Sequence, residues 1–392
     1  MQNVVITSGV RTAIGTFGGS LKDYPAPDLA GLVIREAIQR SKVEPETIGD
    51  VIIGQCMQRT DELPTGRLAA LKAGLPIQVP GVTIQRNCAS GMQAIVYAAQ
   101  QIMLGDMDIA IAGGVEVMSR VPYTIDKARW GIRLQHSTIA DGIWDGLTDA
   151  WSGLIMGLTA ENLAEKYNIS REEQDIVALK SHNSAEKAIK EGRFKDEIIP
   201  VQIKGKKGSV TTFEQDEHVR MGSTLEQLAA LKPIYKKDGT VTAGNASGIN
   251  DAAAAVVLMG EKEAERRGLE PMGRLVAYGV AGVEPELMGY GPVPATKIAL
   301  ERAKIKLDDI ELIELNEAFA AQYLACEKLL NLNREIINVN GSGIALGHPV
   351  GCTGTRIVIT LLNEMKRRNL KYGLATLCVG GGMGMATIWS RD

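Results

Sequence analysis

Short apolar runs alternate along the chain with longer stretches in which apolar residues recur every three or four positions. The periodic stretches at residues 27–41 and 90–104 predict amphipathic helices, because this spacing places the apolar side chains on one face. The short runs predict buried strands at residues 3–7, 50–53, 108–112, 253–259 and 373–379. Strands that alternate with helices in this way indicate an α/β protein.

The order of these elements recurs once along the chain. A Pro-x-Pro segment, a helix pattern, an acidic turn and an apolar strand begin at Pro25, and the same order begins at Pro292. Turns of small residues at 88–91 and 351–354 then open a helix that leads to a further strand. Although any two strand and helix units share part of this plan, the shared order predicts two similar halves.

The two predicted halves are separated by a segment of different character. The first half comprises residues 1–119 together with 246–270, and the second comprises residues 271–392. Between them, residues 120–245 contain a helix pattern at 170–191 and a run with Lys204, Lys206 and Lys207. Long insertions in α/β enzymes usually build binding surface or oligomer contacts, so we predict an inserted loop domain. The three lysines could attract phosphate groups or could simply be solvated.

The length and the net charge of the chain exclude some classes of function. At 392 residues, the chain is long for one ordinary domain, which fits one fold used twice. Its 43 Lys and Arg against 46 Asp and Glu give a net charge of −3, without the basic surplus of a nucleic-acid-binding protein. The apolar runs are too short for a membrane span, and the first residues lack a secretory pattern. We therefore expect a cytoplasmic protein, with no nucleic acid and no membrane as partners.

The five cysteines are odd in number and widely spaced, and no CxxC pair occurs among them. This usage predicts neither a disulfide framework nor a structural zinc site. The four histidines show no metal-binding spacing either, so we expect no metal. Any cysteine that contributes chemistry should therefore act as a thiol.

Two cysteines stand in contexts that favour chemistry. Cys88 follows an apolar stretch and lies within two residues of a predicted helix start. Helix N–H groups there would lower its pKa, and the turn would expose its sulfur, although a small buried core residue is the alternative. Cys378 precedes three glycines, beginning with Gly380, whose N–H groups could bind an oxyanion. The same glycines could instead form a tight bend between the last two strands.

A histidine and an asparagine complete the candidates. His348 lies among glycines on a predicted loop, from which an imidazole could reach a substrate, although a lone histidine is more often structural. Asn316 follows a predicted strand directly and could hold a water molecule or a carbonyl group. The alternative for Asn316 is the N-cap of the next helix, a position that favours asparagine.

Taken together, four segments resemble the signature blocks of the thiolase family, in the same order and at matching spacing. They are NCASGMQA around Cys88, NEAFA from Asn316, GHPVGCTG around His348 and CVGGGMG from Cys378. Segments beginning at Gly244 and Met156 also match, so the resemblance covers essentially the whole chain. It implies a thiolase fold, with two similar βαβαβαββ halves packed as α-β-α-β-α layers around an inserted loop domain.

The resemblance also implies a reaction. The chain is most similar to the acetyl-CoA C-acetyltransferase branch of the family, which joins two acetyl-CoA molecules into acetoacetyl-CoA and CoA by ping-pong kinetics. It implies that Cys88 becomes acylated while His348 takes its proton, and that the N–H groups of Cys88 and Gly380 bind the oxyanion. Cys378 is the implied base of the second half-reaction, with His348 and a water held by Asn316 as the donors to the thioester oxygen.

The resemblance further implies where CoA binds. The implied positions are Arg220 near the adenine and phosphates, Ala243, Ala246, Ser247 and Phe319 along the pantetheine, and Met156 near the thioester. Several relatives carry a histidine in place of Met156 and a small hydroxyl residue in place of Gln227, so these two positions depart from the family pattern. Acetyl-CoA, acetoacetyl-CoA and CoA are the expected partners, as substrates and products, and no cofactor is expected.

The segment at residues 120–151 contains three of the four tryptophans. Such an apolar segment is costly to leave in water, and the resemblance implies that it ties dimers into a homotetramer, with a dimer as the fallback. The alternative is a lid over the chain's own site. Two functional alternatives also stay open, namely a degradative 3-ketoacyl-CoA thiolase of broader chain length and a catalytically silent CoA-binding protein.

Overall fold

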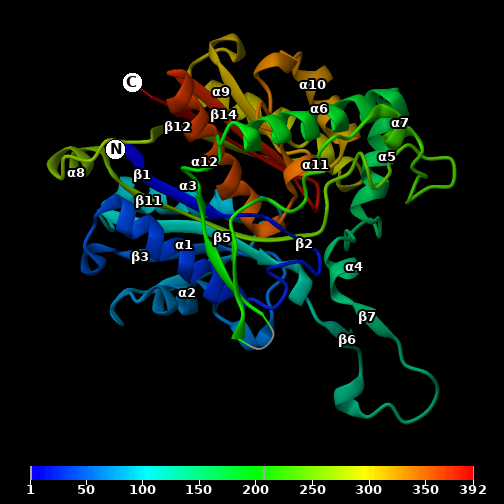
Figure 1. Ribbon diagram of the computed structural model, residues 1–392, viewed down its shortest axis with the longest axis horizontal. Coiled ribbons are helices and arrows are strands. Elements are labelled where there is room, and N and C mark those ends of the chain that lie inside the picture. Colours follow the sequence, from blue (N-terminus) through cyan, green and yellow to red (C-terminus); the bar gives the residue numbers. More distant parts are fainter. Residues whose placement is uncertain (1, 206–207, 392) are drawn as a thin grey trace.

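The computed structural model describes residues 2–205 and 208–391, and most of its strands join into one 11-stranded sheet (Figure 1). The strands of this sheet are β1 (Val4–Thr12), β2 (Gly15–Thr16), β3 (Asp50–Gly54), β4 (Gly81–Ile84), β5 (Ile109–Val117), β8 (Ile198–Ile199), β11 (Asn250–Gly260), β12 (Gly273–Gly282), β13 (Leu312–Leu315), β14 (Tyr372–Val379) and β15 (Met383–Ser390). All five strands predicted from the apolar runs are therefore confirmed, and each is longer than predicted.

The strand order shows the repeat that the sequence predicted. The main path is β13-β14-β15-β12-β1-β11-β5-β3-β4. In the first half, β3 is parallel to β5, β5 is antiparallel to β11, and β11 is antiparallel to β1. The second half repeats this arrangement: β13 is parallel to β14, β14 is antiparallel to β15, and β15 is antiparallel to β12. The two sets meet where β1 pairs with β12, at Val5 with Arg274 and Ile6 with Gly273. Two halves of like topology are thus joined edge to edge.

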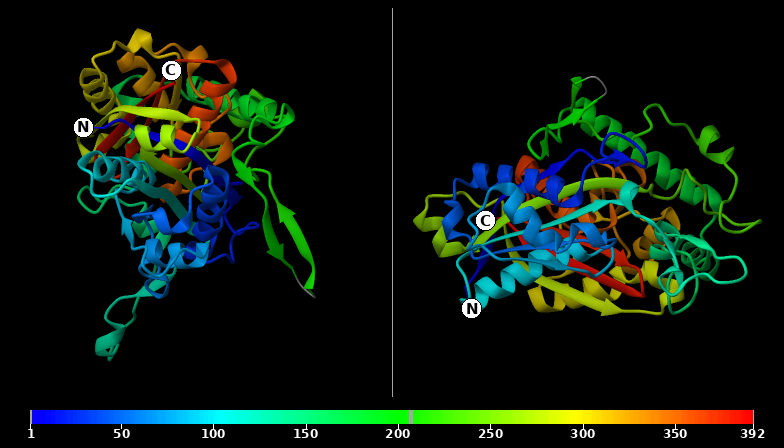
Figure 2. Two further views of the ribbon diagram at one scale, coloured as in Figure 1. Left: turned by 90° about the vertical axis from the view of Figure 1, so that its left-hand side faces the viewer. Right: turned by 90° about the horizontal axis from the view of Figure 1, so that it is seen from below.

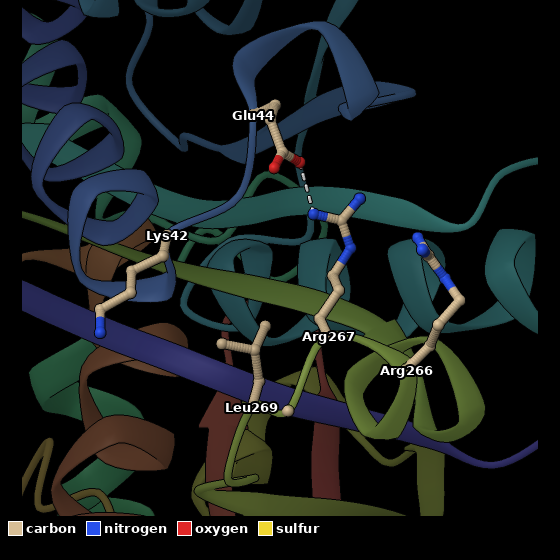
Figure 3. A pocket seen from close by; sticks show the side chains of 6 residues that line it. Lys42, Glu44, Arg266, Arg267 and Leu269 are labelled. Carbon is tan, nitrogen blue, oxygen red and sulfur yellow. Dashed lines mark hydrogen bonds and ion pairs between the residues drawn. The ribbon is translucent and has the colours of Figure 1, made fainter.

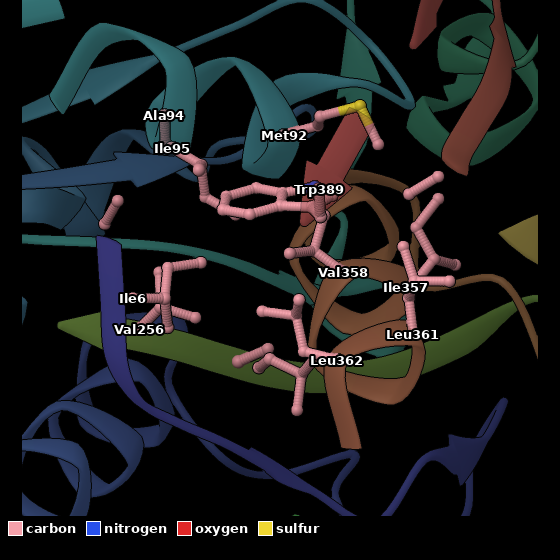
Figure 4. Packing of buried hydrophobic residues seen from close by; sticks show 14 of the residues in the cluster. Ile6, Met92, Ala94, Ile95, Val256, Ile357, Val358, Leu361, Leu362 and Trp389 are labelled. Carbon is pink, nitrogen blue, oxygen red and sulfur yellow. The ribbon is translucent and has the colours of Figure 1, made fainter. Parts of the chain in front are cut away.

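Helices lie between and outside the two sets of strands. α3 (Ser90–Leu104) and α12 (Val350–Arg368) pack on each other between them, in a core that takes apolar side chains from both halves. Figure 4 shows this core, where Trp389 of β15 lies among Met92 and Ile95 of α3, Ile6 of β1 and Val358 of α12. α3 is mostly apolar, and α12 is amphipathic and buried along most of its length, as far as Met365.

Two further cores cover the outer faces. α1 (Ala26–Ser41) and α2 (Thr65–Ala73) pack outside the first set of strands, and α9 (Pro292–Ala303) and α10 (Ala320–Leu330) pack outside the second. Both helices predicted from the periodicity, α1 and α3, are confirmed. The layers therefore follow the order α-β-α-β-α that the resemblance implies. The short helices α8 (Glu261–Arg266) and α11 (Gly343–Leu346) complete the two halves.

The segment between β5 and β11 contains smaller elements. Its α-helices in the described residues are α4 (Gly142–Gly146), α5 (Met156–Lys166), α6 (Arg171–Lys190) and α7 (Leu225–Ala229). Besides β8, which pairs with β1, its strands form the hairpins β6 (Tyr123–Ile125) with β7 (Ile139–Asp141) and β9 (Val201–Lys204) with β10 (Val210–Phe213). α6 confirms the helix predicted at 170–191. Both hairpins extend away from the layered body (Figure 2). Lys204 ends β9 and is exposed, whereas Lys206 and Lys207 lie outside the described residues.

Within the described ranges, none of the helices has the length and apolar character needed to cross a membrane. The domain boundaries proposed from the sequence stay predictions, although β11, from the far side of the inserted segment, pairs between β1 and β5.

Candidate active site

Cys88 lies in the turn between β4 and α3, as the sequence predicted. β4 ends at Ile84 and α3 begins at Ser90, and the turn is closed by the Ser90 N–H, which donates to the Asn87 carbonyl at 3.0 Å. Asn87 has a φ of +40°, a left-handed conformation that asparagine tolerates better than most residues. The half-buried Cys88 lines a cavity of about 110 Å³, so it is not merely a core filler.

Cys378 lies in the same cavity, although 290 positions separate it from Cys88 in the numbering. It is the last residue but one of β14 and is fully buried. Gly380 to Gly382 then turn the chain into β15, and the φ angles of Gly381 and Gly382 are +86° and +77°. The glycines thus form the bend between the last two strands, and Gly380 also donates a backbone N–H hydrogen bond to Cys88.

His348 lies in the short loop between α11 and α12 and also lines the cavity. Its Nδ1 atom is 2.6 Å from the Thr353 hydroxyl oxygen, which is 2.9 Å from the Pro349 carbonyl oxygen. A hydroxyl has one hydrogen, and the carbonyl can only accept, so the hydroxyl donates to Pro349 and accepts from the Nδ1–H of His348. Nε2 is then a bare acceptor, buried and without a hydrogen-bond partner in the described part of the chain. The geometry thus favours His348 as a proton acceptor.

Asn316 follows β13 directly, beside the imidazole. Its Nδ2 atom lies 3.5 Å from Nδ1 of His348, and its Oδ1 atom is buried without a hydrogen-bond partner among the described residues. The following helix α10 begins at Ala320 and its N-cap is Phe319, so the N-cap interpretation of Asn316 is wrong. Asn316 does not itself line the cavity but lies behind His348, which does. A buried carbonyl oxygen without a partner is suited to a water molecule or a substrate group.

The pKa values of these groups are set mainly by burial. Burial raises the pKa of Cys88 to about 11, although hydrogen bonds from the backbone N–H groups of Gly380 and Cys88 oppose this. The predicted net lowering by the helix N-terminus is therefore wrong, because desolvation outweighs the N–H groups. Burial also raises the pKa of Cys378 and, with the nearby Arg356, lowers that of His348 to about 3. Two neutral thiols thus face a neutral imidazole that can accept a proton.

Close packing of α3 on α12 brings the two loops together. A Cβ atom added at Gly354 of α12 would lie 2.5 Å from the Met92 nitrogen, and one added at Gly91 would lie 2.8 Å from the Gly351 carbonyl oxygen. Only glycine permits such an approach between the backbones. Because each helix begins two residues after a candidate site residue, this contact sets the separation between thiol and imidazole.

The buried carboxylate of Glu116 braces the same region. It accepts hydrogen bonds from the backbone N–H groups of Cys56 at 2.9 Å, Met57 at 3.0 Å and Gly351 at 2.8 Å. Burial raises the pKa of Glu116 to about 7, and the three hydrogen bonds oppose this. One side chain at the end of β5 therefore ties the loop after β3 to the start of α12.

The cavity contains some of the predicted CoA-binding residues but not others. Met156, Ser247 and Phe319 line it. Ala246 forms an isolated bridge with Phe319, and the Ser247 N–H donates to the Ala318 carbonyl at 2.9 Å, so these two segments form one wall.

Arg220 and Ala243 are exposed and do not line this cavity. The backbone N–H of Arg220 donates to Nδ1 of His182 at 3.3 Å. Gln227 forms the capping box of α7 with Thr224, which occupies its side chain in a local role. The assignment of Arg220 and Ala243 to CoA binding therefore stays a prediction.

Several residues at the site were not singled out from the sequence. They include Thr353, whose position five residues after His348 in the same motif is the signal that could have found it. Asn250 accepts the His348 N–H at 3.0 Å, and Tyr235 lines the cavity. Asn250 lies in the matching segment that begins at Gly244, but neither residue was singled out within its segment. No local pattern marks such residues.

A second hollow, on the surface between α1 and α8, is lined by Lys42, Glu44, Arg266, Arg267 and the segment 268–269 (Figure 3). Arg267 forms ion pairs with Glu44 and Glu263, and Arg266 forms one with Glu263. Acidic side chains therefore already neutralise both guanidinium groups of this hollow. Among the described residues, no cluster of histidine, cysteine or acidic side chains is suited to holding a metal ion. The cavity with the two thiols is therefore the candidate active site.

A nucleophilic thiol with two backbone N–H donors, beside a neutral imidazole and a second thiol, defines a class of enzymes that transfer acyl groups through a cysteine. The comparisons with known families agree. The thiolase N-terminal domain matches residues 4–262 and the thiolase C-terminal domain matches residues 269–391. The chain belongs to the thiolase family, and it is an acyltransferase with the thiolase fold.

Similar proteins cover the whole chain. It is 53% identical to the beta-ketothiolase BktB of Cupriavidus necator and 49% identical to an acetyl-CoA acetyltransferase of Pseudomonas aeruginosa, in each case over 100% of this chain and at least 99% of the relative. The crystal structure of the Bacillus anthracis acetyl-CoA acetyltransferase matches with a TM-score of 0.98 at 55% identity, over 100% and 99% of the two chains. Human mitochondrial 3-ketoacyl-CoA thiolase in complex with CoA matches with a TM-score of 0.96 at 43% identity, over 100% and 98%.

Proposed function

We propose that this protein is an acetyl-CoA C-acetyltransferase, which condenses two acetyl-CoA molecules to acetoacetyl-CoA and CoA and catalyses the reverse thiolysis. The observation that carries the proposal is the meeting of Cys88, Cys378 and His348 around one cavity. The names of similar proteins support acetyl-CoA as the substrate. CoA thioesters are substrates and products in this proposal, and no cofactor takes part.

In the first half-reaction, Nε2 of His348 accepts the Cys88 proton while the sulfur attacks the thioester carbonyl. A base is needed because the pKa of Cys88, about 11, keeps the thiol protonated at neutral pH. The backbone N–H groups of Cys88 and Gly380 donate hydrogen bonds to the carbonyl oxygen and stabilise the negative charge that develops on it. CoA leaves as a thiolate, and Cys378 gives it a proton. The acyl group is then on Cys88 and Cys378 is a thiolate.

In the second half-reaction, the Cys378 thiolate removes a proton from the methyl carbon of a new acetyl-CoA. The thioester oxygen must be stabilised for this proton to leave, and we assign that role to His348, now protonated, and to a water held by Asn316. The enolate attacks the acetyl group on Cys88 to form the carbon–carbon bond. Cys88 departs as a thiolate and recovers its proton from His348. Every proton is thus accounted for, and the kinetics are ping-pong.

We assign CoA binding to the wall beside these groups. Met156 lies near the thioester in this assignment, and Ala246, Ser247 and Phe319 contact the pantetheine. The exposed Arg220 and Ala243 are assigned to the outer part of CoA, where a guanidinium group suits phosphates. Their accessibility supports this, although they do not line the inner cavity.

Mass spectrometry after incubation with acetyl-CoA tests the proposal. We expect an acetyl group, about 42 Da, on Cys88, and no label in Cys88→Ala. Cys378→Ala should still be acetylated but should form no acetoacetyl-CoA, because the base is missing. If it retained condensation, the role of Cys378 would be wrong. CoA binding without any acetylation would instead indicate a catalytically silent CoA-binding protein.

A degradative 3-ketoacyl-CoA thiolase of broader chain length is the second candidate. The similarity to a beta-ketothiolase and to human 3-ketoacyl-CoA thiolase supports it, as does the apolar cavity wall at Leu147, Ile155 and Met288. Comparing kcat/KM for thiolysis of acetoacetyl-CoA and a 3-ketooctanoyl thioester separates the two. A marked preference for the longer substrate would favour the degradative enzyme.

We further propose that the protein is a homotetramer, with a dimer as the alternative, and acts in the cytoplasm in fatty acid metabolism. The arm, defined as residues 120–151, supports self-association because Trp130, Leu134 and Trp151 are 80%, 86% and 85% exposed in the single chain. Apolar side chains exposed to this extent favour a protein interface. The arm extends away from the body (Figure 2), which is less suited to the alternative of a lid.

A further inference from the structure

The turn that carries the Gly380 N–H has little stiffness of its own. It consists of three consecutive glycines, two of them in the left-handed region. Its far end is fixed, because the Val283 N–H donates to the Gly382 carbonyl at 2.7 Å. In the proposed reaction, the Gly380 N–H has to point at the carbonyl oxygen of the acyl group that reacts with the Cys88 sulfur. The near end follows Val379, which pairs with Met383 across the hairpin, but this pairing does not itself fix the peptide planes on either side of Gly380.

Asn87 provides a contact to this near end. Its Nδ2 atom donates to the Gly380 carbonyl oxygen at 2.8 Å, across 293 positions of sequence. A backbone carbonyl can only accept a hydrogen bond, so the amide of Asn87 has to face it with its nitrogen. Asn87 and Cys88, which are adjacent, thus hold Gly380 from both sides, one through its carbonyl and the other through its N–H.

The amide oxygen of Asn87 also has hydrogen-bond partners. Its Oδ1 atom accepts a hydrogen bond from Nε2 of Gln85 at 3.0 Å and from the Cys56 thiol at 3.5 Å. The left-handed backbone of Asn87, at a φ of +40°, aims the side chain at Gly380. An amide with hydrogen bonds at both ends has a fixed orientation, as a positioning group requires.

We propose that Asn87 is a positioning residue for acyl transfer, which fixes the Gly380 N–H donor relative to the sulfur of Cys88. This inference rests on the proposed function. Asn87 does not line the cavity, so it acts through Gly380 and not on the substrate. Because it precedes the nucleophile in the chain, it ties the oxyanion donor to the nucleophile itself.

The test compares two reactions of the same sulfur in Asn87→Gly. Glycine adopts the left-handed conformation without strain, so this change removes the amide with little effect on the backbone. Acetylation of Cys88 by acetyl-CoA passes through an oxyanion, whereas alkylation by iodoacetamide displaces iodide at a saturated carbon and forms none. We expect acetylation to slow about ten- to hundredfold, and alkylation, which the Gly380 N–H affects only through the thiolate fraction of Cys88, to slow several-fold less.

Two further variants make the test specific. Asn331→Gly changes another left-handed asparagine, the exposed C-cap of α10, and should leave both rates unchanged. Asn87→Asp keeps the side-chain size but cannot donate to the Gly380 carbonyl when ionised, so it should lose acetylation as Asn87→Gly does. If either Asn87 variant acetylates at the wild-type rate, or if both reactions slow equally, the inference is wrong. If wild-type Cys88 takes up no acetyl group, the proposed function itself fails, and the inference fails with it.

Discussion

The imidazole of His348 and the hydroxyl of Thr353 are 2.6 Å apart, and this hydrogen bond decides which ring nitrogen can act as a base. Thr353 lies in the first turn of α12, where its hydroxyl donates to the Pro349 carbonyl and can only accept from the ring. Nδ1 therefore carries the proton and Nε2 is left bare. A buried ring with its tautomer fixed in this way is ready to accept a proton from a thiol.

Thr353→Val should lower the rate of Cys88 acetylation by about ten- to hundredfold, because Nδ1–H loses its acceptor and both the ring orientation and the tautomer become free. The lost hydrogen bond should also cost about 1–3 kcal/mol of unfolding free energy. Single-turnover acetylation followed by mass spectrometry, together with urea unfolding, measures the two effects. Thr353→Ser keeps the hydroxyl and serves as the control. A wild-type acetylation rate in the valine variant would contradict this role.

The thiol of Cys88 should react as a neutral thiol in the free enzyme. Because its pKa is raised to about 11 and that of His348 is lowered to about 3, no thiolate and imidazolium pair forms at neutral pH. Alkylation depends on the thiolate fraction, so its rate should rise about tenfold per pH unit between pH 7 and 10. Peptide mapping after timed exposure to iodoacetamide separates Cys88 from the half-buried Cys56. A plateau that begins near pH 5 would show an ion pair instead.

The arm should govern the oligomeric state. We expect that Trp130→Ser combined with Leu134→Ser converts tetramers to dimers, because both side chains are more exposed in the single chain than almost any other apolar group. Light scattering on the eluting protein measures the mass of the assembly. Ile176→Ser, at an exposed position on α6, is the matched control. An unchanged tetramer in the double variant would show that the arm does not join the subunits.

The elements of the fold were predictable where the pattern of apolar residues was strong. The continuous run of apolar residues in β11 and the three- and four-residue spacing of apolar residues in α3 could each be found from neighbouring residues alone. The pairing of β1 with β12, which joins the two halves, involves only two residue pairs and leaves no local mark. The repeat predicted two like halves, but not how they meet.

The site was predictable in part, for a similar reason. The spacing of Cys88 and Cys378 says nothing about their distance in space, and their meeting was expected only from the family resemblance. Helix N–H groups near Cys88 are visible in the sequence, whereas the depth of burial that reverses their effect on the pKa is a property of the whole fold. The roles of Thr353 and Asn250 depend on contacts with His348 that the sequence does not display.

The contact between α3 and α12 sets two opposing effects against each other at Gly354. In an isolated helix, Gly354→Ala would stabilise by about 1 kcal/mol, because alanine has the higher helix propensity. In this fold, the new Cβ would lie 2.5 Å from the backbone nitrogen of Met92, and a backbone atom cannot move aside as a flexible side chain can. Overpacking of this kind costs about 1–3 kcal/mol, so we expect net destabilisation.

The same substitution should also impair the chemistry, because separating the helices moves His348 away from Cys88. We expect Gly354→Ala to lower the urea midpoint and to slow acetylation of Cys88 under conditions in which the protein is still folded. Gly282→Ala is the control, since its added Cβ would meet only a carbonyl oxygen at 3.9 Å. A variant that is more stable than the wild type would show that the helices can separate without cost. Lower stability with an unchanged acetylation rate would show that the helix contact does not set the distance between thiol and imidazole.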